Sequence, residues 1–184
     1  MERKLKRDKK HIQTASGVKF YPFKPSSLDV VLEDGAQALS LQCRYSGHTK
    51  WKDKMKHYSV AQHSLYVSYV CKYPLWGLLH DLTEAYCVDV PTPIKKRVPK
   101  FKEMEDKIER AIAIRFNLEW PRPPEVKEAD IHAFNIEWAL LMGGDKRTKL
   151  YKQAIKDKVF LKILNYSMEE TKDAFIKRYK ELTS

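Results

Sequence analysis

The chain of 184 residues has only six glycines, and none of them belongs to a phosphate-binding loop. Neither GxGxxG nor GxxxxGK followed by Ser or Thr occurs, which excludes the two common glycine-rich ways of cradling a nucleotide phosphate. Any phosphate binding must therefore come from side chains, from metal ions or from helix ends.

Cysteine and long apolar runs are scarce as well. Cys43, Cys71 and Cys87 contain no CxxC pair, and their odd number argues against a disulfide framework, so we expect small core side chains in a reducing compartment. No apolar run approaches the ~18 residues of a membrane span. The basic N-terminus lacks the apolar stretch of a signal peptide, and the sequence therefore predicts a cytoplasmic protein without membrane association.

Positive charge is abundant, because 35 Lys and Arg against 24 Asp and Glu give a net charge of +11. Residues 1–10 hold six basic and two acidic side chains and are expected to form a solvated arm. The surplus favours polyanionic partners such as nucleotides or nucleic acid, although charge alone fits a simple solubility function equally well.

Apolar periodicity predicts one all-α domain of six or seven helices, because no stretch shows the alternation of a strand. Residues 1–25 are expected to be a basic arm and an extended lead-in whose aromatic rings pack on the domain, and residues 26–184 a helical core. Ser59 is expected to cap the second helix. Helices are predicted from residue 28, from residue 60, and over 75–86, about 104–116, 124–142, 149–164 and 168–182.

The sharpest chemical signal is the pair His80-Asp81, which follows an apolar helical stretch. Adjacent residues diverge by about 100° on a helix, so both can reach one ion only where the helix ends or bends. Glu84 lies three residues past Asp81 and stands over the same place. Three ionisable groups are costly to bury together without a cation, and a metal ion resolves that cost.

His63 and Asp130 lie on two other predicted helices and complete a mixed nitrogen and oxygen ligand set. Two His and two Asp suit Mn, Co, Fe, Zn or Mg, and the set does not distinguish among these divalent metals. Each residue alone has a plainer explanation: a helix-ending His-Asp pair, a hydrogen-bonded core histidine, or a solvated aspartate. The order His, His-Asp, Asp over three helices favours the metal site.

The same residues sit in segments that resemble the HD superfamily of metal-dependent phosphohydrolases. Within it, residues 28–142 are most similar to the small bacterial and phage proteins related to HD-domain 5'-deoxynucleotidases. The segments are ALSLQCRYSGHT (38–49), YSVAQHS (58–64), LLHD (78–81), EAY (84–86), DVP (89–91), PIK (93–95) and VKEAD (126–130).

The resemblance implies an all-α fold, hydrolysis of nucleotide phosphate esters or anhydrides, and assembly into a homo-oligomer. Glu84 and Asp89 match acidic residues that orient or activate the attacking water, and Arg44 and Lys95 match residues that hold the phosphate. Tyr45 occupies a position near the sugar that is tryptophan in well-known relatives, and residues 51–57 (WKDKMKH) form a longer, more basic stretch than usual. The implied metal ligands are His63, His80, Asp81 and Asp130.

The leading expectation is a phosphohydrolase of deoxynucleoside 5'-monophosphates, with release of triphosphate from dATP as a close variant. A nucleic-acid-binding protein with a degenerate site is an alternative of another class, suggested by the charge and by Trp51 among lysines. Hydrolysis of a stringent-response alarmone is a third. His48 and His57, which flank the basic loop, are expected to be solvated.

Overall fold

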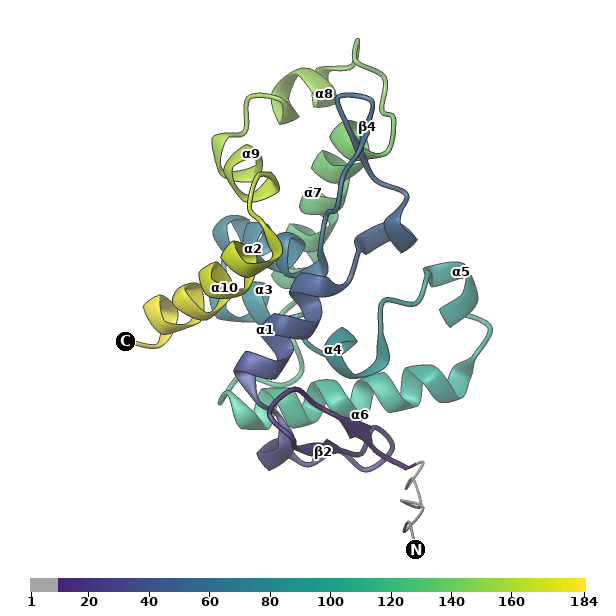
Figure 1. The fold of residues 1–184 in the computed structure, drawn as a ribbon, viewed down its shortest axis with the longest axis vertical. Coiled ribbons are helices and arrows are strands. Elements are labelled where there is room, and N and C mark those ends of the chain that lie inside the picture. The colour runs from purple at the N-terminus through teal and green to yellow at the C-terminus, as the bar shows by residue number, and fades with distance from the viewer. Residues whose placement is uncertain (1–9) are drawn as a thin grey trace, which may run out of the picture.

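A computed structural model describes residues 10–184, so the predicted basic arm lies outside the described residues except for Lys10. The described part is mainly helical, which confirms the all-α expectation (Figure 1). Its α-helices are α1 (Leu32–Leu41), α2 (Val60–Val70), α3 (Pro74–Leu79), α4 (Glu84–Cys87), α5 (Thr92–Lys95), α6 (Pro99–Arg115), α7 (Pro124–Leu141), α8 (Lys149–Ala154), α9 (Lys158–Leu164) and α10 (Met168–Thr183). Smaller elements are the 3-10 turns η1 (Ser27–Asp29) and η2 (Arg44–Gly47) and the strands β1 (Ile12–Gln13), β2 (Lys19–Phe20), β3 (Lys50–Trp51) and β4 (Lys54–Met55).

Ten helices in the described residues exceed the six or seven expected, because stretches predicted as continuous are broken. The stretch 75–86 stops being helical after Leu79 and resumes at Glu84, and 149–164 divides into α8 and α9. Asp157 causes the second break by capping α9, since its side chain accepts a hydrogen bond from the Phe160 amide. The single turn α5 lies outside the helices predicted from the sequence, and it has a proline in its first turn, where no amide hydrogen is needed.

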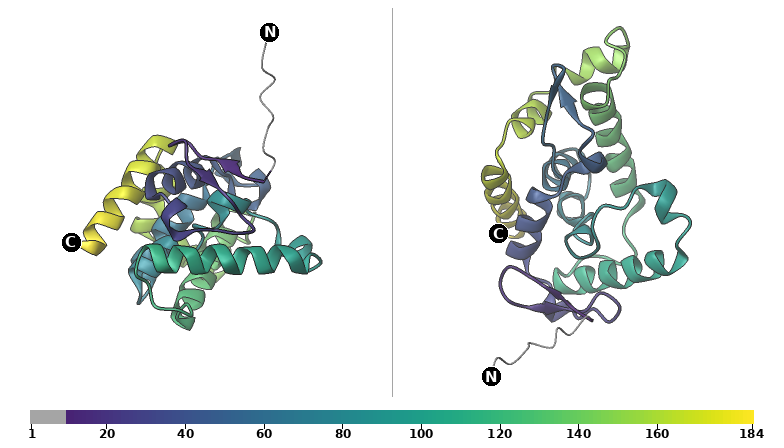
Figure 2. Two further views of the ribbon diagram at one scale, coloured as in Figure 1. Left: turned by 90° about the horizontal axis from the view of Figure 1, so that it is seen from below. Right: turned by 45° about the vertical axis from the view of Figure 1, so that its right-hand side comes forward.

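The central helix is α2, whose residues 60–68 are all buried. Ser59 caps it as predicted, in a capping box with Gln62. In the right-hand view of Figure 2, α2 lies between α7 on one side and α10 on the other, and it contacts both. This helix positions His63 in the interior of the protein.

Helix α3 packs closely against α2, and Gly77 permits the approach. A Cβ atom added at Gly77 would lie 2.9 Å from the Cβ of Cys71 and 3.1 Å from the Cα of Ser68. Because α3 ends two residues later, this contact determines where His80 stands relative to α2.

The N-terminal lead-in forms the hairpin β1–β2, and a second hairpin joins β3 to β4, although no strand was expected. Phe20 is fully buried and stacks on Tyr86 with ring centroids 3.8 Å apart, as the lead-in was predicted to do. Phe23, in contrast, is exposed. All three cysteines are free, and none of the described helices is long and apolar enough to cross a membrane.

Candidate metal centre

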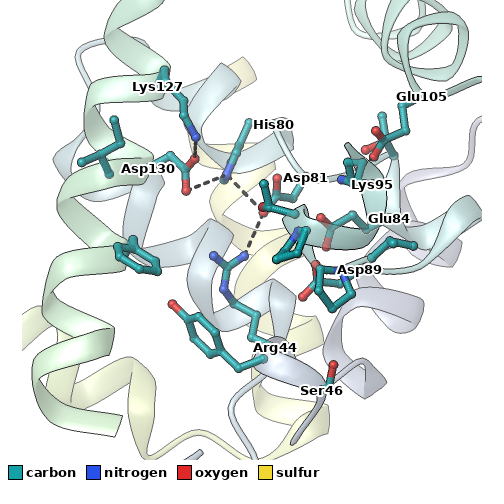
Figure 3. A pocket seen from close by; sticks show the side chains of 18 of the residues that line it. Arg44, Ser46, His80, Asp81, Glu84, Asp89, Lys95, Glu105, Lys127 and Asp130 are labelled. Carbon is teal, nitrogen blue, oxygen red and sulfur yellow. Dashed lines mark hydrogen bonds and ion pairs between the residues drawn. The ribbon is translucent and has the colours of Figure 1, made fainter. Parts of the chain in front are cut away.

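Three separate elements bring the four predicted ligands together. His63 comes from α2, and Asp130 comes from α7. His80 caps the end of α3 and Asp81 lies in the turn that follows, so the two adjacent side chains face one point because the helix has ended. Figure 3 shows the labelled His80, Asp81 and Asp130 side chains grouped in this way.

The facing atoms lie at distances that one ion can span. His63 Nε2 lies 3.2 Å from His80 Nε2, 3.6 Å from Asp81 Oδ2 and 3.2 Å from Asp130 Oδ1. His80 Nε2 lies 3.2 Å from Asp81 Oδ2 and 4.0 Å from Asp130 Oδ1. Ligand bonds of about 2.0–2.2 Å place donor atoms about 3–3.5 Å apart, so His63, His80 and Asp81 could hold one divalent cation, and Asp130 lies beside both histidines.

Hydrogen bonds on the far side of each ring also suit a metal ion. His80 Nδ1 donates to the Gly77 carbonyl at 2.8 Å, and His63 Nδ1 donates to Glu137 Oε1 at 2.5 Å. Both Nε2 atoms therefore face each other with their lone pairs available, deep in the protein, and only a proton or a cation between them avoids repulsion. Histidine ligands are commonly held by such a second hydrogen bond.

Glu137 is the main site residue that the sequence reasoning missed. Its carboxylate is completely buried and accepts hydrogen bonds from the Tyr58 hydroxyl at 2.9 Å and the Tyr45 hydroxyl at 2.6 Å, in addition to the bond from His63. Arg44 Nε lies 3.3 Å from its second oxygen. Glu137 is seven residues after Asp130, two turns along the same helix face, and that spacing was the available signal.

The charges of this network shift the ionisation of its members. Burial and the nearby Arg44 lower the pKa of His63, but Glu137 and Asp130 outweigh them and raise it to about 9. Burial raises the pKa of Asp130, but its hydrogen bond and charge interaction with His63 prevail and hold that pKa below its usual value. The histidine is thus protonated and paired when no cation is bound.

Arg44 lies between two acids, and its side chain is mostly buried, with 11% exposed. Its Nη1 donates to Asp81 Oδ2 at 3.1 Å, while Nε faces Glu137. Burial lowers the pKa of Arg44, yet Glu137 and Asp81 raise it well above its ordinary value, so the group stays charged. The backbone just after it is in the left-handed region, with φ of 54° at Tyr45 and 51° at Ser46, a costly conformation that is often found at functional sites.

The remaining predicted residues line the same cavity of about 990 Å³ as the predicted ligands His80, Asp81 and Asp130. Glu84 is buried, and its Oε2 has no hydrogen-bond partner among the described residues. Burial, together with the negative charges of Asp81 and Asp89, raises the pKa of Glu84 well above its usual value. On the same side of the cavity as Glu84, Lys95 Nζ donates to Glu105 Oε1 at 2.7 Å (Figure 3).

The two histidines expected to be solvated differ in their surroundings. His48 is exposed but lines the mouth of the cavity, whereas a ring nitrogen of His57 lies 3.4 Å from the Leu41 carbonyl. The basic stretch 51–57 runs from the end of β3 through the turn and β4, and Trp51 borders a separate, smaller cavity beside the end of α7. None of residues 51–57 lines the cavity of the metal centre.

Comparisons with known proteins add relatives but no activity. No family model matches the chain. It is 40% identical over 123 residues to the uncharacterized protein YfdR of Escherichia coli. The match covers 65% of the chain and 66% of that relative. It is 32% identical over 115 residues to an uncharacterized protein of Rhodobacter capsulatus, covering 57% of each. The chain thus spans somewhat less than two thirds of the length of these relatives.

Proposed function

We propose that the chain is a metal-dependent phosphohydrolase that acts on nucleotides, with deoxynucleoside 5'-monophosphates as the first substrates to test. The observation that carries this proposal is the convergence of four ligand atoms at a cavity that also presents Arg44, Lys95 and the buried carboxyl of Glu84. Phosphoryl transfer needs these parts: neutralised charge, a gripped phosphate and an oriented water molecule.

His63 and His80 would hold the metal through Nε2, and Asp81 and Asp130 through one carboxylate oxygen each. A bound divalent ion would lower the pKa of a water molecule and neutralise charge on a phosphate oxygen. The donor set does not select among Mn, Co, Fe, Zn and Mg.

Arg44 grips the phosphate with those N–H groups that Asp81 and Glu137 leave available, and its burial strengthens each charge-assisted bond. Lys95, which also lines the cavity, supplies a point charge. Both residues orient the ester bond without taking part in proton transfer.

Glu84 is the proposed proton acceptor from the attacking water. Its Oε2 is free of hydrogen bonds within the described residues, and its raised pKa makes the carboxylate a stronger base than an exposed one. Asp89, which lines the cavity beside Glu84, keeps that carboxyl basic through its negative charge and is proposed to help orient the water.

The test combines metal analysis of the purified protein with a panel of nucleoside mono-, di- and triphosphates and identification of the phosphorus product. We expect one metal ion per chain and release of inorganic phosphate from monophosphates. His80→Ala should lose metal and activity together, while His57→Ala, which changes a histidine outside the cavity, should keep both. Release of triphosphate would assign the dATP-type variant, and inactivity on the whole panel with metal bound would overturn the proposal.

Three further expectations stay predictions: homo-oligomer formation, nucleic-acid binding and a cytoplasmic location. Binding of single-stranded oligonucleotide that falls with salt and is unaffected by Asp81→Ala would favour the nucleic-acid-binding alternative. Hydrolysis of a guanosine alarmone in the same panel would favour the signalling-nucleotide alternative.

A further inference from the structure

Helix α7 presents a row of large apolar side chains to the cavity of the metal centre. Ile131, Phe134 and Trp138 all line it and are 49%, 40% and 50% exposed, respectively. We call these three residues the α7 ledge. Half-exposed aromatic rings inside a polar cavity leave apolar surface in water, which a flat apolar ligand would remove.

The ledge begins beside the metal ligands and leads away from them. Phe134 and Trp138 follow Asp130 by four and eight residues, which places them about 6 and 12 Å further along the helix. The rings of Phe134 and Trp138 have centroids 5.7 Å apart, and those of Tyr45 and Phe134 6.3 Å apart. A continuous aromatic wall therefore connects the arginine side of the cavity with its far end.

The cavity thus has a charged part and an aromatic part. Arg44, Asp81 and Glu84 line the first, and the α7 ledge lines the second. A ligand that fills both must carry an anionic group at one end and a flat apolar group at the other, joined by a spacer that spans one to two helical turns. A nucleotide has this form, since a pentose separates its phosphate from its base.

We propose, on the basis of the function proposed above, that the α7 ledge is the subsite for the nucleobase, which stacks on Phe134 and Trp138 while Arg44 holds the phosphate. Stacking on aromatic rings accepts every base because every base has a π face. The three ledge side chains offer one hydrogen-bonding group, the Trp138 indole N–H, so the subsite favours the larger purine rings over pyrimidines and discriminates weakly between adenine and guanine.

The first experiment compares a nucleotide with its base-free counterpart. Phe134→Ala and Trp138→Ala are assayed with deoxyadenosine 5'-monophosphate and with deoxyribose 5-phosphate. KM for the nucleotide should rise about tenfold, within the range measured for loss of one base-stacking ring, while KM and kcat for the sugar phosphate stay unchanged. Phe23→Ala, an exposed phenylalanine outside the cavity, is the matched control and should change neither substrate.

Two results would overturn the ledge as a base subsite. Equal losses of activity on both substrates would show that the two rings affect the metal centre only through the structure. An unchanged ratio of the two KM values, with a changed elution volume on gel filtration, would make the ledge an interface between copies of the chain.

A binding measurement separates this inference from the proposed function. Deoxyadenosine, which has no phosphate to hydrolyse, should quench the tryptophan fluorescence of the wild type and quench Trp138→Phe much less. If no nucleotide is hydrolysed and this quenching is seen, the hydrolase proposal fails and the base subsite stands. Absent quenching, or quenching of equal size in Trp138→Phe, would overturn the subsite whatever the enzyme activity.

Discussion

Glu137 Oε1 lies 2.5 Å from His63 Nδ1, and this contact determines which nitrogen of His63 faces the other ligands. Because a carboxylate only accepts hydrogen bonds, Nδ1 carries a proton and Nε2 points toward His80 and Asp130. The buried Glu137 carboxylate thus sets the orientation of His63, a proposed metal ligand.

Glu137→Gln should weaken metal binding about 10- to 100-fold, the usual cost of losing such a supporting partner. The variant keeps the shape of the side chain but removes the charge that favours the Nδ1–H form of His63. Calorimetric titration of metal into the metal-free protein measures the effect, with circular dichroism to verify folding. Glu128→Gln, an exposed change on the same helix, is the matched control. Equal affinities for the two variants would contradict this orienting effect.

Metal binding should become tighter with rising pH. The pKa of His63 without metal is raised to about 9, so an ion must displace the Nε2 proton at any lower pH. The apparent affinity should rise about tenfold per pH unit between pH 7 and pH 9 and level off above. Calorimetry in buffers of different ionisation enthalpy counts the released proton, and zero release at pH 7 would refute the expectation.

The same proton should stabilise the metal-free fold. A histidine whose folded pKa is raised from 6.5 to about 9 contributes stability that is fully present below pH 6.5 and is lost as the pH rises through 9. The Tm of the metal-free protein should therefore fall between pH 7 and pH 9.5. This fall in Tm should disappear in His63→Gln. If the fall persists in that variant, groups other than His63 cause it.

Glu84→Gln should separate catalysis from stability. Loss of a proton acceptor should lower kcat by at least about 100-fold while metal content stays unchanged. The fold should become more stable, because burial and two neighbouring acids disfavour the charged carboxyl. A raised carboxyl pKa gives stability at low pH that is lost as the pH rises, so the gain in Tm should be larger at pH 8 than at pH 5. The exposed Glu103→Gln serves as control, and unchanged kcat in Glu84→Gln would remove Glu84 from the mechanism.

Gly77→Ala should destabilise the protein by about 1–3 kcal/mol, because the new methyl group overpacks the α2–α3 contact. It should also weaken metal binding, since the Gly77 carbonyl holds His80 Nδ1. Gly144→Ala is the matched control: its Cβ would meet the Cα of Ala139 at 2.6 Å, at the far end of α7. Both variants should lower the free energy of unfolding in a denaturant titration, and only Gly77→Ala should lose metal affinity.

Local sequence patterns predicted much of the fold, because they depend on neighbours in the chain. The Ser59 cap and the helices now called α6, α7 and α10 are examples. The non-helical turn from His80 to Thr83 was not predicted, since the helix was expected to continue through residue 86. The requirement that His80 and Asp81 sit at a helix end was nevertheless evident from their adjacency.

The contacts of Glu137 could not be predicted from the sequence. A glutamate in a helix is usually solvated, and its two hydroxyl partners, Tyr45 and Tyr58, are 92 and 79 residues away in the chain. The pairing of Arg44 with this carboxylate was hidden for the same reason. Only the packing of α2 and η2 against α7 makes these contacts visible.

Arg44 lies between Asp81 and Glu137, and this position has a thermodynamic consequence. An ion that takes up the charge of Asp81 weakens the hold of that carboxylate on the guanidinium and leaves it more available to an incoming anion. Under the proposed function, binding of metal and binding of phosphate would then be positively cooperative, and each would tighten the other by the same factor.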